Sequence, residues 1–424
     1  MQSDPRHGLA GRWPIGHRLL ILLENEPYPY DRRVRHEAES LTDAGYEVTV
    51  VSPTGARAPE RETTLGGVRV LRFEAPPPGG SVLGYLREYL LALRGMAGVL
   101  RQLRTEPPFA AVIACNPPDV LILLARLLMR GTPGLVLDYH DPSPELFEAI
   151  FGRRGMLYRL LLGFERLAFR AADVVMTVNE PCADLIRGRG KVPADRVFVV
   201  YTFPDPRRFF PVAARPELRE GREYLVLWVG RMSRKEGLPL LLEAADRLVN
   251  QLGRTDVAFS IVGRGDVREE LAAEIEQRGL AGVVNLPGEA DVDRLREYMA
   301  TADVCLSLDM RSPMNDRSIM VKVLEYMAMG RPVVQFPLPE MRRLCGEATL
   351  YARNGDAHDV AERIGELLDD AARRARLGEA ARECVLNGLT WPDQVPTLLR
   401  AVEQAIQRDH RPGPPAFPAG RTLG

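Results

Sequence analysis

The chain has 424 residues, which corresponds to two large domains or three small ones at about 150 residues per domain. Apolar residues make up 46% and charged residues 27%, as in ordinary globular proteins, and this excludes a collagen-like, coiled-coil or wholly disordered chain. Lys and Arg number 56 against 57 Asp and Glu, so the chain lacks the basic excess of a dedicated nucleic-acid binder.

The start of the chain and its cysteines indicate where the protein works. Residues 1–16 contain Pro, Gly and charges but no apolar segment of a signal peptide, so we expect them to be disordered. No apolar stretch reaches the roughly 20 residues of a membrane-spanning helix. The five cysteines are widely spaced and odd in number, which favours a reducing cytoplasm over a disulfide scaffold or a structural zinc site.

The segment 17–205 alternates apolar strands with helices. Strands that are apolar almost throughout, separated by helices, are typical of a parallel sheet covered on both faces. This segment is therefore predicted to form an N-terminal Rossmann-like domain. The expected strands are 17–23, 47–52, 68–73, 109–115, 135–140, 174–178 and 197–202, and the expected helices are 34–45, 82–104, 118–130, 155–172 and 181–189.

A proline-rich and charged stretch interrupts this rhythm, and we expect residues 206–221 to be an interdomain linker. The alternation resumes over 222–386, which predicts a second Rossmann-like domain. A helix within 387–408 is expected to return to the first domain, and the tail 409–424 to be disordered. The predicted fold class is α/β, with two doubly wound domains facing each other across a cleft at the carboxyl ends of their strands.

The helix expected at 318–329 carries polar residues at helical spacing. Ser318, Lys322 and Glu325 share one face, and Asp316 or Ser318 could cap the helix. Free N–H groups at a helix start suit a phosphate, Lys322 adds a cation, and Glu325 could accept hydrogen bonds from ribose hydroxyls. The alternative is that Lys322 and Glu325 form a solvated surface pair.

Three cations and three glycines follow strands of the second domain, at the edge where ligands bind in doubly wound sheets. Cations in a strand-to-helix turn suit a diphosphate, although they could also simply solvate the turn. Glycines allow a ligand to approach the backbone closely. The cations are Arg231, Arg234 and Lys235, and the glycines are Gly263, Gly265 and Gly288.

In the first domain, His140 and Asp141 follow the strand 135–140 and should lie at the corresponding edge. A histidine there could donate to a sugar hydroxyl or a phosphate, or it could be structural.

Two helices, 85–104 and 152–170, interleave arginines with Leu, Tyr and Phe. This pattern is typical of helices at anionic membranes, but also of sheet-covering helices with arginines that extend to the solvent.

Several sequence blocks in order resemble the retaining glycosyltransferases of family 4, which have the two-domain GT-B fold. The blocks are DRRVRHEAESLTDAGYEVTVV, DYHDPSPELF, RAADVVMTVNE, IVGRGD and NDRSIMVKVLEYMAMGRPVV with GEATLYARNGD, and the resemblance spans residues 17–407. They are most similar to a bacterial subgroup linked to cell-surface polysaccharide or O-antigen assembly.

The resemblance implies roles for individual residues. It places Arg231 at the donor diphosphate, Glu325 at the nucleoside hydroxyls and His140 against the donor sugar. Two positions differ from the family pattern. Arg317 stands where the first glutamate of the E-x7-E motif is usual, and Glu236 replaces a lysine, so Arg234, Lys235 or Lys322 must supply the second positive charge.

The implied reaction is glycosyl transfer from a nucleotide-diphosphate sugar with retention of configuration, without a metal or a further cofactor. The expected partners are the nucleotide sugar, a sugar or lipid-linked acceptor and an anionic membrane surface, with no nucleic acid. We expect a cytoplasmic protein that is peripheral on the inner face of the membrane. Acceptor contacts are expected from Tyr30, Asp31, Arg32 and Asp141.

Two other functions fit the same fold. A nucleotide-sugar 2-epimerase would need acid–base carboxylates and histidines in the cleft, and this chain offers few. A non-catalytic nucleotide-sugar-binding homologue is suggested by Arg317 and Glu236.

Overall fold

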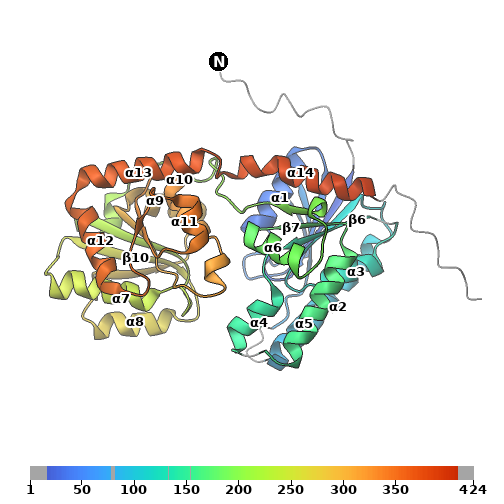
Figure 1. Ribbon diagram of the computed structural model, residues 1–424, viewed down its shortest axis with the longest axis horizontal. Coiled ribbons are helices and arrows are strands. Elements are labelled where there is room, and N and C mark those ends of the chain that lie inside the picture. The colour runs from blue at the N-terminus through green and yellow to red at the C-terminus, as the bar shows by residue number, and fades with distance from the viewer. Residues whose placement is uncertain (1–16, 78–81, 132, 153, 409–424) are drawn as a thin grey trace, which may run out of the picture. The chain divides into compact units, whose positions relative to one another are not determined.

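A computed structural model describes residues 17–77, 82–131, 133–152 and 154–408 (Figure 1). The predictions for 1–16 and 409–424 therefore lie outside the described residues. The chain forms two compact units. Unit 1 comprises Met1–Tyr201 and Val395–Gly424, and unit 2 comprises Thr202–Gln394.

Unit 1 contains an eight-stranded sheet in the order β3-β4-β2-β1-β5-β6-β7-β8. Neighbouring strands are parallel, except for the antiparallel pair β3 and β4. The chain builds the sheet outward from β1 on one side, then returns to add β5 on the other. The strands are β1 (Arg18–Leu22), β2 (Glu47–Pro53), β3 (Glu62–Leu65), β4 (Val68–Phe73), β5 (Ala111–Cys115), β6 (Gly134–Tyr139), β7 (Val174–Thr177) and β8 (Val197–Val199).

Every residue of β5 and β6 is buried, because these central strands are covered on both faces. Their side chains pack with the apolar sides of the helices, and Leu100, Leu137 and Phe169 belong to this core. The helices of the first segment are α1 (Arg32–Asp43), α2 (Val82–Leu103), α3 (Leu121–Leu128), α4 (Ser143–Phe151), α5 (Met156–Ala171) and α6 (Glu180–Gly188).

The last described helix, α14 (Trp391–Arg408), contributes its residues from Val395 onward to unit 1. Leu398, Val402 and Ala405 on this helix are fully buried. The helix backbone lies so close to the first residue of β6 that a Cβ on Gly134 would be 2.4 Å from the carbonyl oxygen of Ala405. Glycine at this position is therefore what allows the helix to approach the sheet.

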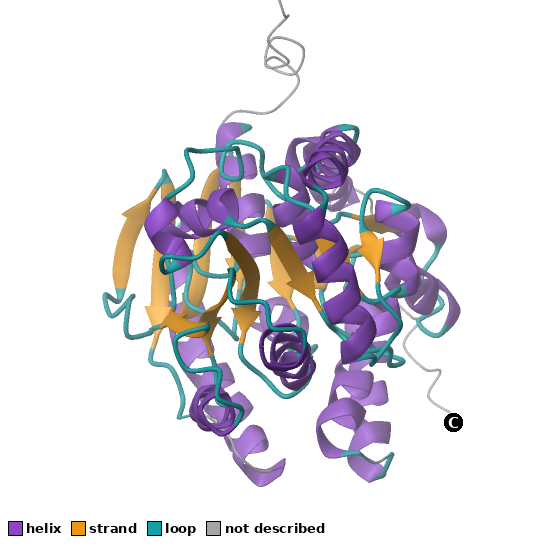
Figure 2. Ribbon diagram, turned by 90° about the vertical axis from the view of Figure 1, so that its left-hand side faces the viewer, coloured by secondary structure: helices purple, strands orange, loops and turns teal. Residues whose placement is uncertain are grey.

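Unit 2 contains a six-stranded parallel sheet in the order β11-β10-β9-β12-β13-β14. In Figure 2, helices in purple flank strands in orange. The strands are β9 (Tyr224–Arg231), β10 (Val257–Arg264), β11 (Val284–Gly288), β12 (Val304–Ser307), β13 (Val333–Gln335) and β14 (Leu350–Tyr351), and the helices are α7 (Leu238–Asp246), α8 (Arg268–Gln277), α9 (Val292–Thr301), α10 (Val321–Ala328), α11 (Pro339–Cys345), α12 (Ala357–Asp369) and α13 (Ala371–Leu386).

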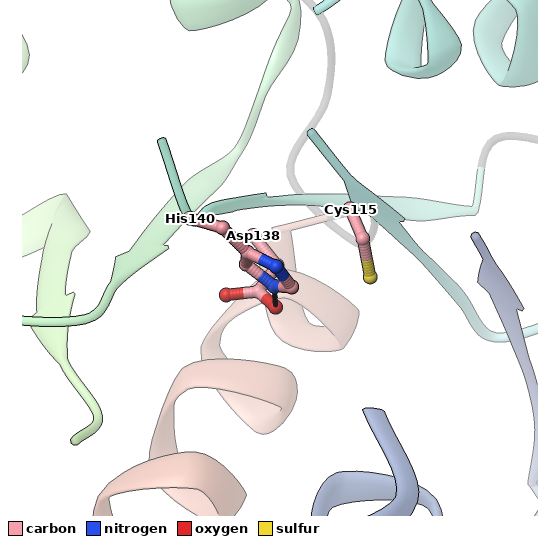
Figure 3. A group of neighbouring side chains, drawn as sticks. All are labelled: Cys115, Asp138 and His140. Atoms are coloured by element: carbon pink, nitrogen blue, oxygen red, sulfur yellow. Dashed lines mark hydrogen bonds and ion pairs between the residues drawn. The ribbon is translucent and has the colours of Figure 1, made fainter. Parts of the chain in front are cut away.

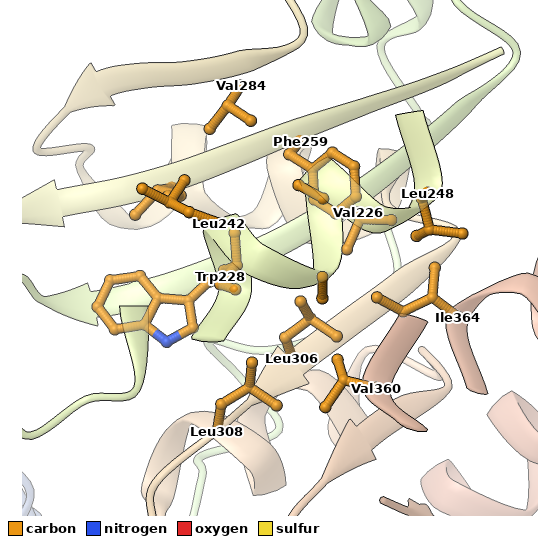
Figure 4. Packing of buried hydrophobic residues seen from close by; sticks show 14 of the residues in the cluster. Val226, Trp228, Leu242, Leu248, Phe259, Val284, Leu306, Leu308, Val360 and Ile364 are labelled. Carbon is orange, nitrogen blue, oxygen red and sulfur yellow. The ribbon is translucent and has the colours of Figure 1, made fainter. Parts of the chain in front are cut away.

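The core of unit 2 forms where α7 and α12 cover the sheet (Figure 4). Trp228 and Phe259 extend from β9 and β10, Leu306 from β12, and Ile364 from α12, and none is more than 1% exposed. Burying each such side chain contributes about 1.5–3 kcal/mol, so this layer holds the strand ends of unit 2 in fixed positions.

The two sheets confirm the predicted α/β fold class with two doubly wound domains. Each sheet has a point where the strand order reverses, between β1 and β5 in unit 1 and between β9 and β12 in unit 2. Ligands of doubly wound proteins bind at the carboxyl ends of the strands at such points. None of the described helices is long and apolar enough to cross a membrane.

The segment 206–221, expected to be a linker, packs on unit 2. It forms a short 3-10 turn, Pro216–Arg219, in which Leu218 is buried. The Arg215 backbone N–H donates to Thr301 Oγ1 at 2.8 Å, and its guanidinium pairs with Glu297 at 2.9 Å. These contacts explain why the boundary between the units falls earlier, after Tyr201.

Candidate functional site

A buried lysine marks the reversal point of the unit 2 sheet. Lys322 lies in the first turn of α10, and its Nζ is 2.5 Å from Glu236 Oε2 and 3.2 Å from Asp309 Oδ2. The same ammonium lies 4.9 Å from the centre of the Trp228 ring. Carboxylates and an aromatic face together hold the charge in one place.

The partners of Lys322 come from the two strands that flank the reversal point. Glu236 belongs to the turn after β9, and Asp309 follows β12. Ser307 donates to Asp309 Oδ2 at 2.7 Å, which fixes this carboxylate in turn. Burial raises the pKa of the Glu236 carboxyl, and the Lys322 ammonium opposes that rise.

Glu325 lies on α10 one turn beyond Lys322, and it is 1% exposed. Because Lys322 is also buried, the two residues are not the solvated surface pair that was the alternative interpretation. A buried carboxylate near the start of a helix is costly unless it is hydrogen-bonded. The Glu325 side chain takes part in an interaction within the chain, and its role in donor binding stays a prediction.

The predicted start of this helix is wrong. The helix begins at Val321, because the residues before it form a separate 3-10 turn, Asn315–Arg317, after which the backbone is extended. Asp316 pairs with Arg311 at 2.8 Å instead of capping the helix. Ser318 lies in the extended stretch, so it is neither the cap nor part of the face that holds Lys322 and Glu325.

Arg317 is the last residue of that 3-10 turn, and it stands where the family pattern has its first glutamate. Its side chain is exposed. The structure thus brings Lys322 and Glu325 together on α10, whereas Asp316, Arg317 and Ser318 belong to the loop before it.

The three cations after β9 differ in their surroundings. Arg234 pairs with Glu270 at 2.7 Å, and both side chains are largely exposed. Arg231 and Lys235 are exposed, and neither side chain has a hydrogen bond or an ion pair within the described part of the chain. These two cations at the edge of the sheet are consequently available to an anionic ligand.

The glycines at the same edge serve the packing of the backbone. A Cβ on Gly263 would lie 1.8 Å from the Gly230 carbonyl oxygen, and one on Gly265 would lie 1.9 Å from that of Met232. Gly288 has a φ of +87°, which few other residues adopt. These positions require glycine whether or not a ligand approaches them.

In unit 1, His140 belongs to a buried charge network at the end of β6. Its Nε2 pairs with Asp138, and the Arg33 guanidinium contacts the same carboxylate at 2.6 Å and Glu37 at 3.1 Å. Burial alone would lower the pKa of His140, but the Asp138 carboxylate raises it to about 9. The histidine is therefore held as an imidazolium near neutral pH.

Figure 3 shows Cys115, Asp138 and His140 close together, with the imidazole turned toward the carboxylate. One ligand atom from each lies within 4.8 Å of the others, the spacing of a metal site. However, Arg33 Nε and Nη2 approach the Asp138 oxygens at 2.9 and 2.6 Å. A guanidinium therefore occupies the carboxylate, and burial raises the pKa of the Cys115 thiol, so the arrangement does not suit a metal cation.

The residues expected on the acceptor side lie around the start of α1 and the end of β6. Asp31 caps α1 by accepting from the Val34 N–H at 2.8 Å, which gives it a structural role. The Tyr30 hydroxyl donates to the Arg57 carbonyl at 3.1 Å. Arg32 is the first residue of α1 and is half-buried, and Asp141 is half-buried next to His140.

Asp309 and Arg33 escaped the sequence reasoning, whereas Asn116 lies in the segment 115–119, which was expected to line the cleft. Asn116 follows β5, and its side chain fixes the His140 loop by accepting from the His140 N–H at 2.6 Å and donating to the Asp141 carbonyl at 2.7 Å. Asp309 follows β12 and binds Lys322. Asn116 and Asp309 both stand directly after apolar runs of sequence, and this position could have pointed to Asp309 as well. The pairing of Arg33 with Asp138 joins residues 105 positions apart, so the sequence alone could not show it.

Sequence profiles of known families match most of the chain. Residues 30–202 match a profile described as a glycosyl transferase 4-like domain. Residues 223–370 match one described as glycosyl transferases group 1. The first match falls in unit 1 apart from its last residue, and the second falls in unit 2.

Individual proteins are similar over nearly the whole chain. The 2-deoxystreptamine N-acetyl-D-glucosaminyltransferase of Streptomyces fradiae is 26% identical, over 88% of this chain and 89% of its own. Sucrose-phosphate synthase from Thermosynechococcus elongatus has a TM-score of 0.75 at 19% identity, over 92% of this chain and all of its own. Anabaena HepE, solved with UDP and glucose, has a TM-score of 0.66 at 18% identity, over 92% and 98%. With both profiles in order and GT-B neighbours for the fold, the chain belongs to the group 1 glycosyltransferases, family 4, and is a glycosyltransferase.

Proposed function

We propose that the chain transfers a glycosyl unit from a nucleotide-diphosphate sugar to an acceptor with retention of configuration. Unit 2 would bind the donor at the carboxyl edge of β9 and β12. The observation that carries this assignment is the fixed Lys322 ammonium at the reversal point of the sheet, with buried Glu325 on the same helix. The available Arg231 guanidinium at this edge supports it.

The chemistry of the site fits the departure of a nucleoside diphosphate. Negative charge develops on the leaving diphosphate as the glycosidic bond breaks, and preorganised cations stabilise it. Lys322 and Arg231 would supply this charge, with Arg234 or Lys235 nearby, and Glu325 would accept hydrogen bonds from the ribose. In unit 1 the His140 imidazolium would contact the donor sugar.

The structural neighbour HepE was solved with UDP, which makes uridine diphosphate the first donor nucleotide to test. Calorimetric titration with UDP, GDP and ADP should give one preferred nucleotide. Glu325→Gln should weaken its binding by about 1.5–3 kcal/mol, because the ribose would lose charge-assisted hydrogen bonds. Nucleotide affinity equal to the wild type in a folded Glu325→Gln protein would refute the assignment of this site.

The matched control is Glu269→Gln, on the exposed first turn of α8 in the same unit. It removes the same charge from unit 2 without touching α10. Its nucleotide affinity should equal that of the wild type, and a similar loss in both variants would indicate a general effect of charge.

We further infer a role in polysaccharide or glycoconjugate synthesis at a membrane surface, with a sugar or lipid-linked acceptor. The support is a surface of unit 1 formed by α2 and α5, both of which pack against α3 (Figure 1). Its leucines and methionine are unusually exposed, and arginines lie among them, as on helices that bind anionic lipid. The exposed apolar residues are Leu83 (77%), Leu86 (52%), Leu90 (59%), Met156 (84%) and Leu160 (51%).

A further inference from the structure

A buried carboxylate without a partner lies at the reversal point of the unit 1 sheet. Glu24 follows β1 by two residues and is 7% exposed. Among the described residues, none forms a hydrogen bond or an ion pair with it. Its oxygens are not among the fully buried, unpartnered side-chain atoms, so they keep some contact with the surface and can meet a ligand. A largely buried carboxylate without a cationic partner is costly, so this position needs an explanation other than packing.

Other acidic and phenolic groups surround Glu24. Glu88 and Tyr89 come from α2, and Asp119 follows β5, on the other side of the reversal point. Burial and Glu88 raise the pKa of Glu24 to about 7. Burial, Glu24, Glu88, Tyr85 and Asp119 raise the pKa of Tyr89, so Tyr89 lies within electrostatic range of each of these groups.

Asp119 is also buried, with 3% of its surface exposed. Asn116 Nδ2 donates to one of its oxygens at 2.8 Å, and the other oxygen has no hydrogen-bond partner. Two buried carboxylates with open acceptor sites therefore flank the ends of β1 and β5, where doubly wound sheets bind ligands.

The cations of this region are occupied elsewhere. Arg33 pairs with Asp138 at 2.6 Å, and Arg189 pairs with Glu145 and Glu165, both at 2.5 Å. A single metal ion does not fit either. The oxygens of Glu24, Glu88 and Asp119 do not converge within 4.8 Å, unlike the group at Cys115. An ammonium group holds its acceptors about 2.7–2.9 Å from nitrogen, farther than most metal ions hold oxygen ligands, and it does not need to contact all three carboxylates at once.

We propose that Glu24, with Asp119 and Glu88, forms an anionic subsite that binds an ammonium group of the acceptor, so that the acceptor is an amine-bearing sugar or cyclitol. This inference rests on the proposed function, which assigns the acceptor to unit 1. Tyr85 and Tyr89 supply phenolic rings for the faces of a sugar. A phosphate group at this subsite would be repelled, so a lipid-linked acceptor would have to carry its phosphate outside it.

The experiment measures sugar binding to the full chain saturated with UDP, by NMR titration. Glucosamine, N-acetylglucosamine and glucose 6-phosphate serve as probes, because they differ in charge on similar rings. Glucosamine should bind at least about tenfold tighter than N-acetylglucosamine, because one charge-assisted hydrogen bond strengthens binding by about this factor. Glucose 6-phosphate should bind most weakly. Glu24→Gln should remove the preference for glucosamine and leave UDP affinity unchanged.

The matched control is Glu74→Gln, an exposed glutamate of the same unit, which should keep the preference. Equal affinity for glucosamine and N-acetylglucosamine, or a preference that survives in Glu24→Gln, would overturn the inference. If Glu24→Gln does not fold, Glu88→Gln tests the same loss of preference. If UDP does not bind the wild type, the nucleoside diphosphate preferred in the calorimetric titration replaces it. Failure of UDP, GDP and ADP alike would instead contradict the proposed function, so the two failures are distinguishable.

Discussion

The Lys322 site shows how one charge can be supplied from a different element. The resemblance to the family places a lysine at the position of Glu236, in the turn after β9. Here the lysine comes from α10, and Glu236 is its ion-pair partner. The positive charge therefore still lies at the reversal point of the unit 2 sheet, held by two carboxylates.

The ion pair between Glu236 and Lys322 predicts what happens when the charge of Glu236 is reversed. Glu236→Lys places two ammonium groups side by side, and breaking a buried pair costs about 3–5 kcal/mol. We expect a loss of this size in urea unfolding, together with weaker UDP binding. The double variant Glu236→Lys, Lys322→Glu restores an opposite pair and should recover most of the stability. A double variant no more stable than the single one would show that the two residues do not act as a pair.

The buried charges around Asp138, which belong to His140, Arg33 and Glu37, predict how the free energy of unfolding changes with pH. The pKa of His140 is raised from 6.5 to about 9, so its contribution is complete below pH 6.5 and is lost as pH rises through 9. Burial raises the pKa of Glu37 to about 8, and its ionisation acts in the same direction. The unfolding free energy should therefore fall by roughly 3–4 kcal/mol between pH 6.5 and 9.

Urea titrations at several pH values check this expectation. His140→Asn should flatten the curve in this window, whereas His358→Asn, on an exposed residue of α12, should leave it unchanged. A His140→Asn curve parallel to that of the wild type would contradict the assigned protonation.

At the scale of elements, the helix surface of α2 predicts lipid binding. Arg87, Arg94 and Arg101 recur at seven-residue spacing and are exposed. Each arginine near an anionic surface contributes about 1 kcal/mol, so three suffice for weak, reversible attachment. Co-sedimentation with phosphatidylserine vesicles should be detectable at low salt, decrease at high salt, and be lost when all three are replaced by Gln.

The control for this prediction changes the same number of charges elsewhere. Three exposed arginines of unit 2 serve for it, and their replacement by Gln should leave vesicle binding intact. Binding of the wild type to neutral vesicles, or no binding to anionic ones, would refute an electrostatic membrane role for α2. The control residues are Arg268, Arg294 and Arg376.

The elements also show what the sequence could reveal. Strands such as β5 and β6 are buried on both faces, so their apolar runs were readable without the structure. The start of α10 could not be predicted from the sequence, because a local 3-10 turn competes with the helix for the same residues. Arg231, Lys322 and Glu325 were predicted from their positions after a strand and on a helix face, and their binding roles stay predictions. The partners of Lys322, and the isolation of Glu24, depend on contacts between distant segments.

At the scale of the whole molecule, α14 ties the end of the chain to unit 1. Gly134→Ala should place a methyl group against the Ala405 carbonyl and displace this helix, at a cost of roughly 2 kcal/mol. Gly98→Ala is the control, since no atom lies within 4 Å of its Cβ on the exposed side of α2, and it should be neutral or stabilising. Thermal unfolding measures both. Equal stability of the two variants would mean that α14 does not pack closely on β6.

This return of the chain also bears on its synthesis. The ribosome completes the strands of unit 1 first, yet the helix that covers the start of β6 emerges only after all of unit 2. Roughly 190 residues separate the two, and their synthesis takes on the order of 10–40 s at about 5–20 residues per second. Throughout that time the nascent first unit presents an uncovered apolar surface next to Gly134. Chaperones that bind nascent chains would find there a surface that closes only after unit 2 has been made and α14 has emerged.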